Sequence, residues 1–257
     1  MKYITSPDNP FYKELLKLAS SARQRGKAGQ TLLDGVHLLA AYLASGQQPL
    51  HLILTAAALH DEEINSLLNK LPEVPQTQLD EGLFAGLSEL KTVSGILALI
   101  PVPQSEPLPQ MGNFSLLLEN IQDPGNVGSI LRSAAAAGCD TVLMSKGCAD
   151  AWSPKVLRAA MGGHFVLKLH EHADLPGIAR QFEGTIYAAA LAASNSLYEA
   201  RLTGRIAFAV GNEGAGLSQA LLKLAKSIII PMPGKVESLN AAAAAAVCLF
   251  EAVRQRK

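Results

Sequence analysis

Residues 227–257 read SIIIPMPGKVESLNAAAAAAVCLFEAVRQRK, and no other stretch says more about the fold. The apolar run predicts a buried strand over Ser227–Ile230, which enters a turn rich in proline and glycine. The turn leads to the triplet Ser238-Leu239-Asn240, and a helix made almost entirely of alanine is predicted over Ser238–Arg254. Polar side chains at the start of a helix can bind a ligand. A helix surface of alanines lets a ligand or another backbone approach closely, so the two features together predict a binding site or a close backbone contact.

Two other polar segments belong with this one, DPGNVG at Asp123–Gly128 and GNEGAGLS at Gly211–Ser218. Each follows a near-continuous apolar run, which is typical of a parallel strand covered on both faces. The strands expected in this half of the chain are Ser115–Glu119, Thr141–Met144, Phe165–Leu169, Thr185–Ala190, Ile206–Val210 and Ser227–Ile230. The helices expected between them are Val127–Ala137, Ser153–Met161, Leu175–Phe182 and Leu217–Leu224. The alternation predicts an α/β fold with a mainly parallel sheet, whose ligands bind beyond the carboxyl ends of the strands.

The segment from Pro101 to Asn113 holds four prolines in thirteen residues and shows no apolar periodicity. We therefore expect a linker at 101–112 that separates a small α/β domain, residues 1–100, from a larger one, residues 113–257. The smaller domain should open with a helix over roughly Pro10–Arg25, capped by Asn9, followed by a short loop over Ala22–Gln30. Its strands are predicted at Thr31–Leu33, Leu50–Thr55, Val74–Gln78 and Gly95–Ile100.

The totals exclude several classes of protein. The 257 residues include no apolar run suited to a membrane span, and the three widely spaced cysteines fit neither a disulfide framework nor a zinc site. We expect a protein of the reducing cytoplasm, with no bound metal and no membrane partner. The net charge is zero, yet residues 1–30 hold six lysines and arginines against two acidic residues. This arrangement fits either a local basic patch or an ordinary solvated helix face.

A dinucleotide or nucleoside-triphosphate site has no support, because the chain contains neither G-x-G-x-x-G after its first strand nor a G-x-x-x-x-G-K-[ST] loop. The glycine-rich segment at Gly211–Gly216 carries Glu213 at its centre, and a carboxylate would repel a phosphate. It would better suit a cation or the hydroxyls of a ribose. Arg132, six residues after Asn126, could bind a phosphate or a carboxylate, or could be an ordinary exposed arginine of a helix. His164, His170 and His172 could be acid–base or metal-binding groups, but His164, in the context GGHF, is more readily explained as a packed or loop histidine.

Three segments taken together resemble a known family. LLLENIQDPGNVGSILRSAAAAG, FAVGNEGAGLS and IIIPMPGKVESLNAAAAAAVCLFEA look like motifs 1, 2 and 3 of the SpoU-type RNA ribose 2′-O-methyltransferases, within the SPOUT superfamily. SPKVLRAAMGGHFVL resembles the stretch that connects the motifs in that family. The segment KELLKLASSARQRGKAGQTLLDGVHLL is similar to the family's N-terminal substrate-binding domain, which is akin to kink-turn-binding ribosomal proteins.

The resemblance implies a deep trefoil knot in the larger domain, which would bind S-adenosylmethionine and also form a homodimer interface. Knotted chains are rare, so alternation of strands and helices alone would not suggest one. Carried onto this sequence, the residues that the resemblance places at the cofactor are Gly211, Ile230, Leu239, Ala190 and Met232.

The resemblance also implies a set of polar catalytic residues: Arg132, Asn126, Glu213, Ser238 and Asn240. Arg132 is treated in the family as a general base, but an arginine pKa above ~12 makes deprotonation implausible. We expect Arg132 to position an RNA phosphate and to stabilise the alkoxide. Glu213 and Ser238 could instead only cap a helix or satisfy loop amides.

The substrate implied is structured RNA, with ribosomal RNA favoured over transfer RNA because of the separate N-terminal domain. Phosphate contacts are expected from Arg23, Arg25 and Lys27. The alternatives are methylation of transfer RNA and a catalytically silent RNA-binding or assembly protein.

Overall fold

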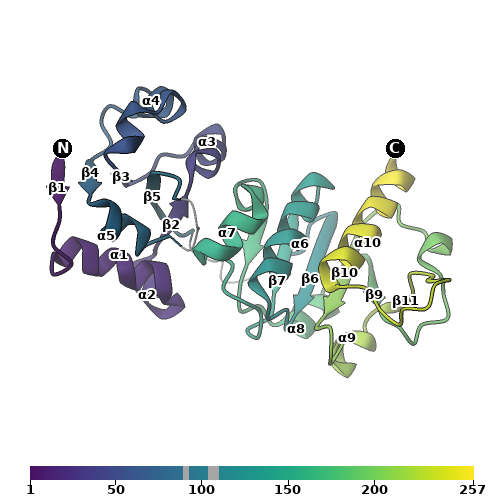
Figure 1. The fold of residues 1–257 in the computed structure, drawn as a ribbon. Helices are drawn as coiled ribbons and strands as arrows, with labels where there is room; N and C mark the ends of the chain where they lie inside the picture. Colours follow the sequence, from purple (N-terminus) through teal and green to yellow (C-terminus); the bar gives the residue numbers. More distant parts are fainter. Residues whose placement is uncertain (89–92, 104–109) are drawn as a thin grey trace. The chain divides into compact units, whose positions relative to one another are not determined.

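The fold is described from a computed structural model, in which residues 1–88, 93–103 and 110–257 are described (Figure 1). Contacts divide the chain into two compact units. The first comprises Met1–Gln104 with Trp152–Phe165, and the second comprises Ser105–Ala151 with Val166–Lys257. Half of the linker predicted at 101–112, residues 104–109, lies outside the described residues. None of the helices in the described ranges is long and apolar enough to cross a membrane.

The first unit is built on a five-stranded sheet with the order β1-β4-β3-β5-β2. Strands β1, β4 and β3 run parallel, and β5 is antiparallel to both β3 and β2. Four strands lie within two residues of their predicted bounds, and β1 was missed because its three residues carry no alternating pattern. The strands are β1 Lys2–Ile4, β2 Gln30–Asp34, β3 His51–Leu54, β4 Gln76–Leu79 and β5 Ile96–Pro101. The helices are α1 Pro10–Ser20, α2 Ala22–Ala28, α3 Val36–Ala44, η1 Ala57–His60, α4 Glu62–Leu68, α5 Glu81–Ala85, α7 Pro154–Ala160 and η2 Gly163–Phe165.

The predicted helix Pro10–Arg25 is in fact two helices. It begins as expected, with Asn9 accepting a hydrogen bond from the amide of Phe11 and Pro10 in the first turn. Ser21 then adopts an extended conformation, ends α1, and caps α2 by accepting a hydrogen bond from the amide of Gln24. The loop predicted over Ala22–Gln30 was therefore wrong, because the cap of Ser21 restarts the helix immediately.

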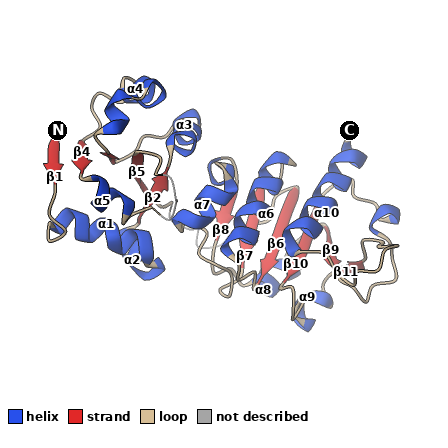
Figure 2. Cartoon of the chain, viewed as in Figure 1, coloured by secondary structure: helices blue, strands red, loops and turns tan. Residues whose placement is uncertain are grey.

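The second unit is a six-stranded, wholly parallel sheet with the order β11-β9-β10-β6-β7-β8, which confirms the predicted fold class (Figure 2). The strands are β6 Phe114–Glu119, β7 Thr141–Met144, β8 Lys168–His170, β9 Thr185–Ala189, β10 Ile206–Gly211 and β11 Lys226–Ile228. The helices are α6 Pro124–Ala136, α8 Leu175–Arg180, η3 Leu197–Glu199, α9 Gln219–Leu222 and α10 Ala241–Arg256. The strand predicted at Phe165–Leu169 begins later, because Gly163–Phe165 forms a 3-10 turn.

Helices cover both faces of this sheet. On one face, Leu117 of β6 and Ala207 of β10 pack with Leu175 of α8 and Leu221 of α9 in one buried cluster. On the other, α10 lies alongside α6 and against β10 (Figure 1). The alanines of α10 allow this close approach, since Ala241 and Ala245 are buried and add little volume. Because the strands of this sheet all run parallel, their carboxyl ends lie at one edge, where the three polar segments emerge.

A buried carboxylate in the first unit allows a test of its packing. The side chain of Asp34 is only 2% exposed and accepts hydrogen bonds from Ser88 Oγ (2.5 Å) and Ser94 Oγ (2.8 Å), with Arg158 Nη1 at 3.8 Å. We expect Asp34→Ala to lower the free energy of unfolding by about 3 kcal/mol, because it leaves buried polar groups without their acceptor. The control Asp8→Ala removes an aspartate from an exposed pair with Lys13 and should cost less than about 1 kcal/mol. Urea unfolding of both variants measures the difference, and equal losses would contradict this account.

Candidate active site

A cavity of about 400 Å³ opens at the carboxyl ends of β9, β10 and β11. Its walls come from the segments that follow these three strands and from the start of α10, so residues far apart in the sequence share one surface. All five residues that the resemblance assigns to the cofactor line it: Gly211, Ile230, Leu239, Ala190 and Met232. Their role as cofactor contacts stays a prediction.

Gly211 stands where the backbone folds back on itself. A Cβ atom at this position would collide with the backbone of Gly216 and would lie 2.6 Å from the amide nitrogen of Leu217. Asn212 and Gly216 form an antiparallel bridge that closes this turn. The absence of a side chain at Gly211 is thus a steric requirement of the loop, and it leaves the end of β10 open to the cavity.

A chain of hydrogen bonds joins the three polar segments next to the cavity. In the side chain of Asn126, Nδ2 donates a hydrogen bond to Glu213 Oε1, and Oδ1 accepts one from Asn240 Nδ2 at 2.9 Å. Asn240 Oδ1 accepts from the backbone amides of Ala242 (2.9 Å) and Ala243 (3.3 Å). Asn240 therefore caps α10 and at the same time orients Asn126, so that the predicted helix start moves from Ser238 to Ala241.

The other predicted catalytic residues have different surroundings. Ser238 lines the cavity and is exposed, and it lies before α10 rather than within it. Arg132 is exposed on α6, and its side chain makes no hydrogen bond or ion pair with any other residue that the structure describes. Its guanidinium, unlike the amide of Asn126, is therefore left available to a ligand.

Three residues that sequence reasoning did not single out hold the loop after β10. Glu119, 7% exposed at the end of β6, accepts a hydrogen bond from the amide of Ser218 at 2.6 Å. Asn212 donates to the carbonyl of Asn120 at 3.1 Å and accepts from the amides of Gly214 and Ala215. The segment carrying Glu213 is thus tied to β6 at both ends. An acidic residue closing an apolar strand was the available signal for Glu119.

The basic residues of the first unit divide into two kinds. Arg23 and Lys27 are exposed on α2. Arg25 is only 5% exposed, and its Nη1 donates to the carbonyls of Leu18 (2.6 Å) and Ala19 (3.2 Å). The expectation that Arg25 contacts RNA is revised, since its guanidinium holds the end of α1 to α2. In the same unit, His164 is buried with its ring 5.1 Å from that of Trp152, as expected for a packed histidine.

Comparison with known proteins places this site in a family. Residues 113–250 match the model of the SpoU rRNA Methylase family. The chain is 34% identical to an uncharacterized tRNA/rRNA methyltransferase of Synechocystis sp., over 98% of this chain and 94% of that protein. It is also 34% identical to the 23S rRNA (guanosine(2553)-2'-O)-methyltransferase RlmP of Bacillus subtilis, over 97% and 98% of the two chains.

A solved structure agrees. The SpoU methyltransferase AviRb from Streptomyces viridochromogenes, in complex with the cofactor AdoMet, superposes with a TM-score of 0.85 at 27% identity, covering 96% of this chain and 98% of that one. Fold and site therefore define a methyltransferase. The chain belongs to the SpoU rRNA methylase family.

The two functions of Asn240 can be separated by substitution. Asn240→Asp keeps an oxygen that caps α10 but removes the donor to Asn126 and adds a charge near it. We expect methyl transfer to fall by about 100-fold, the loss typical of a misplaced site group, with little change in the melting temperature. Asn240→Ala should also lower the free energy of unfolding by about 1 kcal/mol, because the cap is lost. Wild-type activity in Asn240→Asp would show that the amide bridge is not needed.

Proposed function

We propose that this protein is an S-adenosylmethionine-dependent methyltransferase that methylates a ribose 2′-hydroxyl in structured RNA, with ribosomal RNA favoured over transfer RNA. The observation that carries the proposal is the cavity at the sheet edge beside the bridge from Glu213 through Asn126 to Asn240. The name of the Bacillus subtilis relative supports the 2′-hydroxyl and ribosomal RNA.

The residues of the cavity fit the cofactor. About 400 Å³ lies within the range of small-molecule sites, and the lining is largely aliphatic, with the exposed carboxylate of Glu213 at its polar side. That carboxylate suits a sulfonium cation or ribose hydroxyls and disfavours a phosphate. Gly211, Ile230 and Leu239 would hold the cofactor, with Ala190 and Met232 nearby. When bound, it supplies a methyl group on a positively charged sulfur.

The polar residues act on the ribose. A 2′-hydroxyl is scarcely ionised at neutral pH, so the site must stabilise the oxyanion as the proton passes to an RNA phosphate or to water. Arg132 remains protonated and offers a fork of N–H donors for an RNA phosphate and for the alkoxide. Asn126 is held by Glu213 and Asn240, so that it keeps one orientation near the start of α6.

We place a trefoil knot in the second unit and a homodimer interface on it, where Phe250 of α10 is 48% exposed. The N-terminal residues form a substrate-binding domain that resembles kink-turn-binding ribosomal proteins. The enzyme acts in the cytoplasm. A catalytically silent protein is disfavoured because Asn126, Arg132, Glu213, Ser238 and Asn240 are all present.

Methylation mapping tests the activity. Purified protein with labelled S-adenosylmethionine should methylate ribosomal RNA from a strain that lacks the gene, at a ribose 2′-hydroxyl identified by mass spectrometry. Arg132→Ala should reduce the rate by about 100-fold or more, because the oxyanion loses its donor.

Arg132→Lys is the matched control, since it keeps the charge but not the fork. Near-wild-type activity with a shifted pH optimum would contradict the role given to Arg132. If the label entered transfer RNA and not ribosomal RNA, the alternative substrate would be supported. If no RNA were methylated, the proposal would be overturned.

The exposed cations of α2, Arg23 and Lys27, are predicted to contact RNA phosphates. The double charge reversal Arg23→Glu with Lys27→Glu should weaken RNA binding and lower the dependence of affinity on salt, because phosphate contacts release counterions. The matched control Lys70→Glu changes an exposed lysine elsewhere in the same unit. Filter binding between 50 and 200 mM salt, about the range in which such contacts weaken, measures both. Equal affinities for the two variants would remove α2 from the RNA-binding surface.

A further inference from the structure

The connection between β9 and β10, residues 190–205, forms part of the wall of the cavity. We call this segment the strap. Its first residues, Ala190–Ala192, line the cavity, and Leu191 is 59% exposed there. Beyond them the strap continues through the 3-10 turn η3 to the start of β10 (Figure 1). Any ligand of the cavity therefore meets a wall that is mostly loop, and the position of that wall depends on what holds it.

The first half of the strap is held by β11 and the residues after it. The amide of Ala190 donates to the carbonyl of Ile228 at 3.0 Å, and the amide of Leu197 donates to the carbonyl of Ile229 at 2.8 Å. In return the amide of Ile229 donates to the carbonyl of Asn195 at 2.9 Å. This ladder extends the sheet by a few residues and ends just before Ile230, which also lines the cavity.

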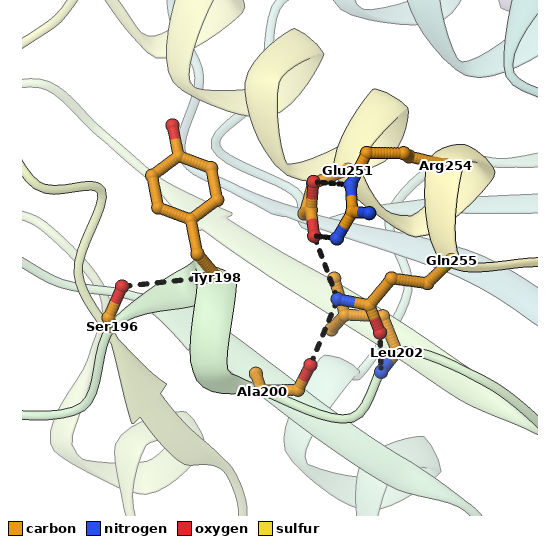
Figure 3. A network of polar contacts seen from close by, with 7 residues as sticks. All are labelled: Ser196, Tyr198, Ala200, Leu202, Glu251, Arg254 and Gln255. Carbon is orange, nitrogen blue, oxygen red and sulfur yellow. Dashed lines mark hydrogen bonds and ion pairs between the residues drawn. The ribbon is translucent and has the colours of Figure 1, made fainter.

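The second half, residues 200–204, belongs to no strand, and side chains from the last turn of α10 form hydrogen bonds with its backbone. Figure 3 shows those of Gln255. Gln255 donates to the carbonyl of Ala200 at 3.1 Å and accepts from the amide of Leu202 at 2.9 Å. Arg256 donates to the carbonyls of Leu202 at 3.1 Å and Gly204 at 2.7 Å. These groups would otherwise need water or another partner.

A buried carboxylate sets the orientation of the Gln255 amide. Glu251 has a side chain that is 7% exposed, and it accepts one N–H of Gln255 at 2.8 Å while Arg254 donates to both of its oxygens at 2.8 Å (Figure 3). These hydrogen bonds from Arg254 and Gln255 lower the pKa of Glu251 to about 2, so it stays ionised at neutral pH. Arg256 is fixed separately, with its guanidinium 4.3 Å from the ring centroid of Phe114.

We propose that Gln255 and Arg256 form a C-terminal latch that positions the strap for cofactor binding. The inference rests on the proposed function, since it assigns the cavity to S-adenosylmethionine. The first turns of α10 contribute Ala241 and Ala244 to the lining of the cavity, and its last turn carries the latch. One helix therefore forms one wall of the cavity and holds the strap that forms another. Because binding and latching involve the same strap, each strengthens the other by reciprocal linkage.

The test compares latch variants by two measurements. Gln255→Ala and Arg256→Ala each remove two bonds to the strap, and Arg256→Lys keeps the charge and part of the donor capacity. Calorimetry with S-adenosylmethionine should show a dissociation constant raised about tenfold for each alanine variant, as expected for the loss of two hydrogen bonds, with partial recovery in Arg256→Lys. RNA affinity should not change.

Limited trypsin digestion measures how accessible the strap is to cleavage. Arg201 is exposed within it, and its carbonyl accepts a hydrogen bond from Tyr187 Oη at 2.7 Å. Cleavage after Arg201 should be faster in the alanine variants without cofactor and should slow when S-adenosylmethionine is added. Lys257→Ala is the control, because Lys257 is exposed and has no hydrogen bond or ion pair with a described residue. It should match the wild type in both measurements.

The possible results distinguish a failure of the latch inference from a failure of the proposed function. Faster cleavage with an unchanged dissociation constant would show that the latch holds the strap without serving the cofactor, and would overturn the inference. Unchanged cleavage and affinity would overturn it as well. Wild-type protein that fails to bind S-adenosylmethionine would overturn the proposed function instead. Near-ultraviolet circular dichroism of each variant identifies any that does not fold, in which case Arg256→Lys carries the comparison.

Discussion

The parallel pairing of β6 with β10 is the constraint on which the rest of the site depends. It sets Glu119 opposite Gly211 in register, so both strands end at the same level of the sheet. Glu119 can then reach the amide of Ser218, and Asn120 can accept from Asn212. Since the two strands are far apart in the sequence, only the sheet brings together the loops that carry Asn126 and Glu213.

Helix α10 has three functions that its composition makes compatible. Its alanines let it lie close to α6, its N-cap Asn240 bridges to Asn126, and its last turn holds the strap through Gln255 and Arg256. A helix with larger side chains at Ala241 and Ala245 would stand further from the sheet. The cap and the latch could then not both reach their partners, because each acts over hydrogen-bond distances.

Helices and strands were predicted well wherever residues next to them in the sequence determine where they begin or end. Asn9 and Pro10 begin α1, and Ser153, where a helix was predicted to begin, caps α7. The errors arise where a competing local bond or a distant partner decided the outcome. Ser21 restarts the helix that was expected to end in a loop, and β1 is a strand because β4 pairs with it.

The sequence by itself determined the α/β class and the three polar segments, because apolar runs and helix caps are properties of neighbouring residues. The residues around the cavity were predicted only through the resemblance of these segments to a known family. The tertiary structure alone decided which of these residues touch. It buried Arg25 against the carbonyls of Leu18 and Ala19, although charge suggested a surface role. It also joined the last turn of α10 to the strap, a pairing between residues more than fifty positions apart that no local pattern encodes.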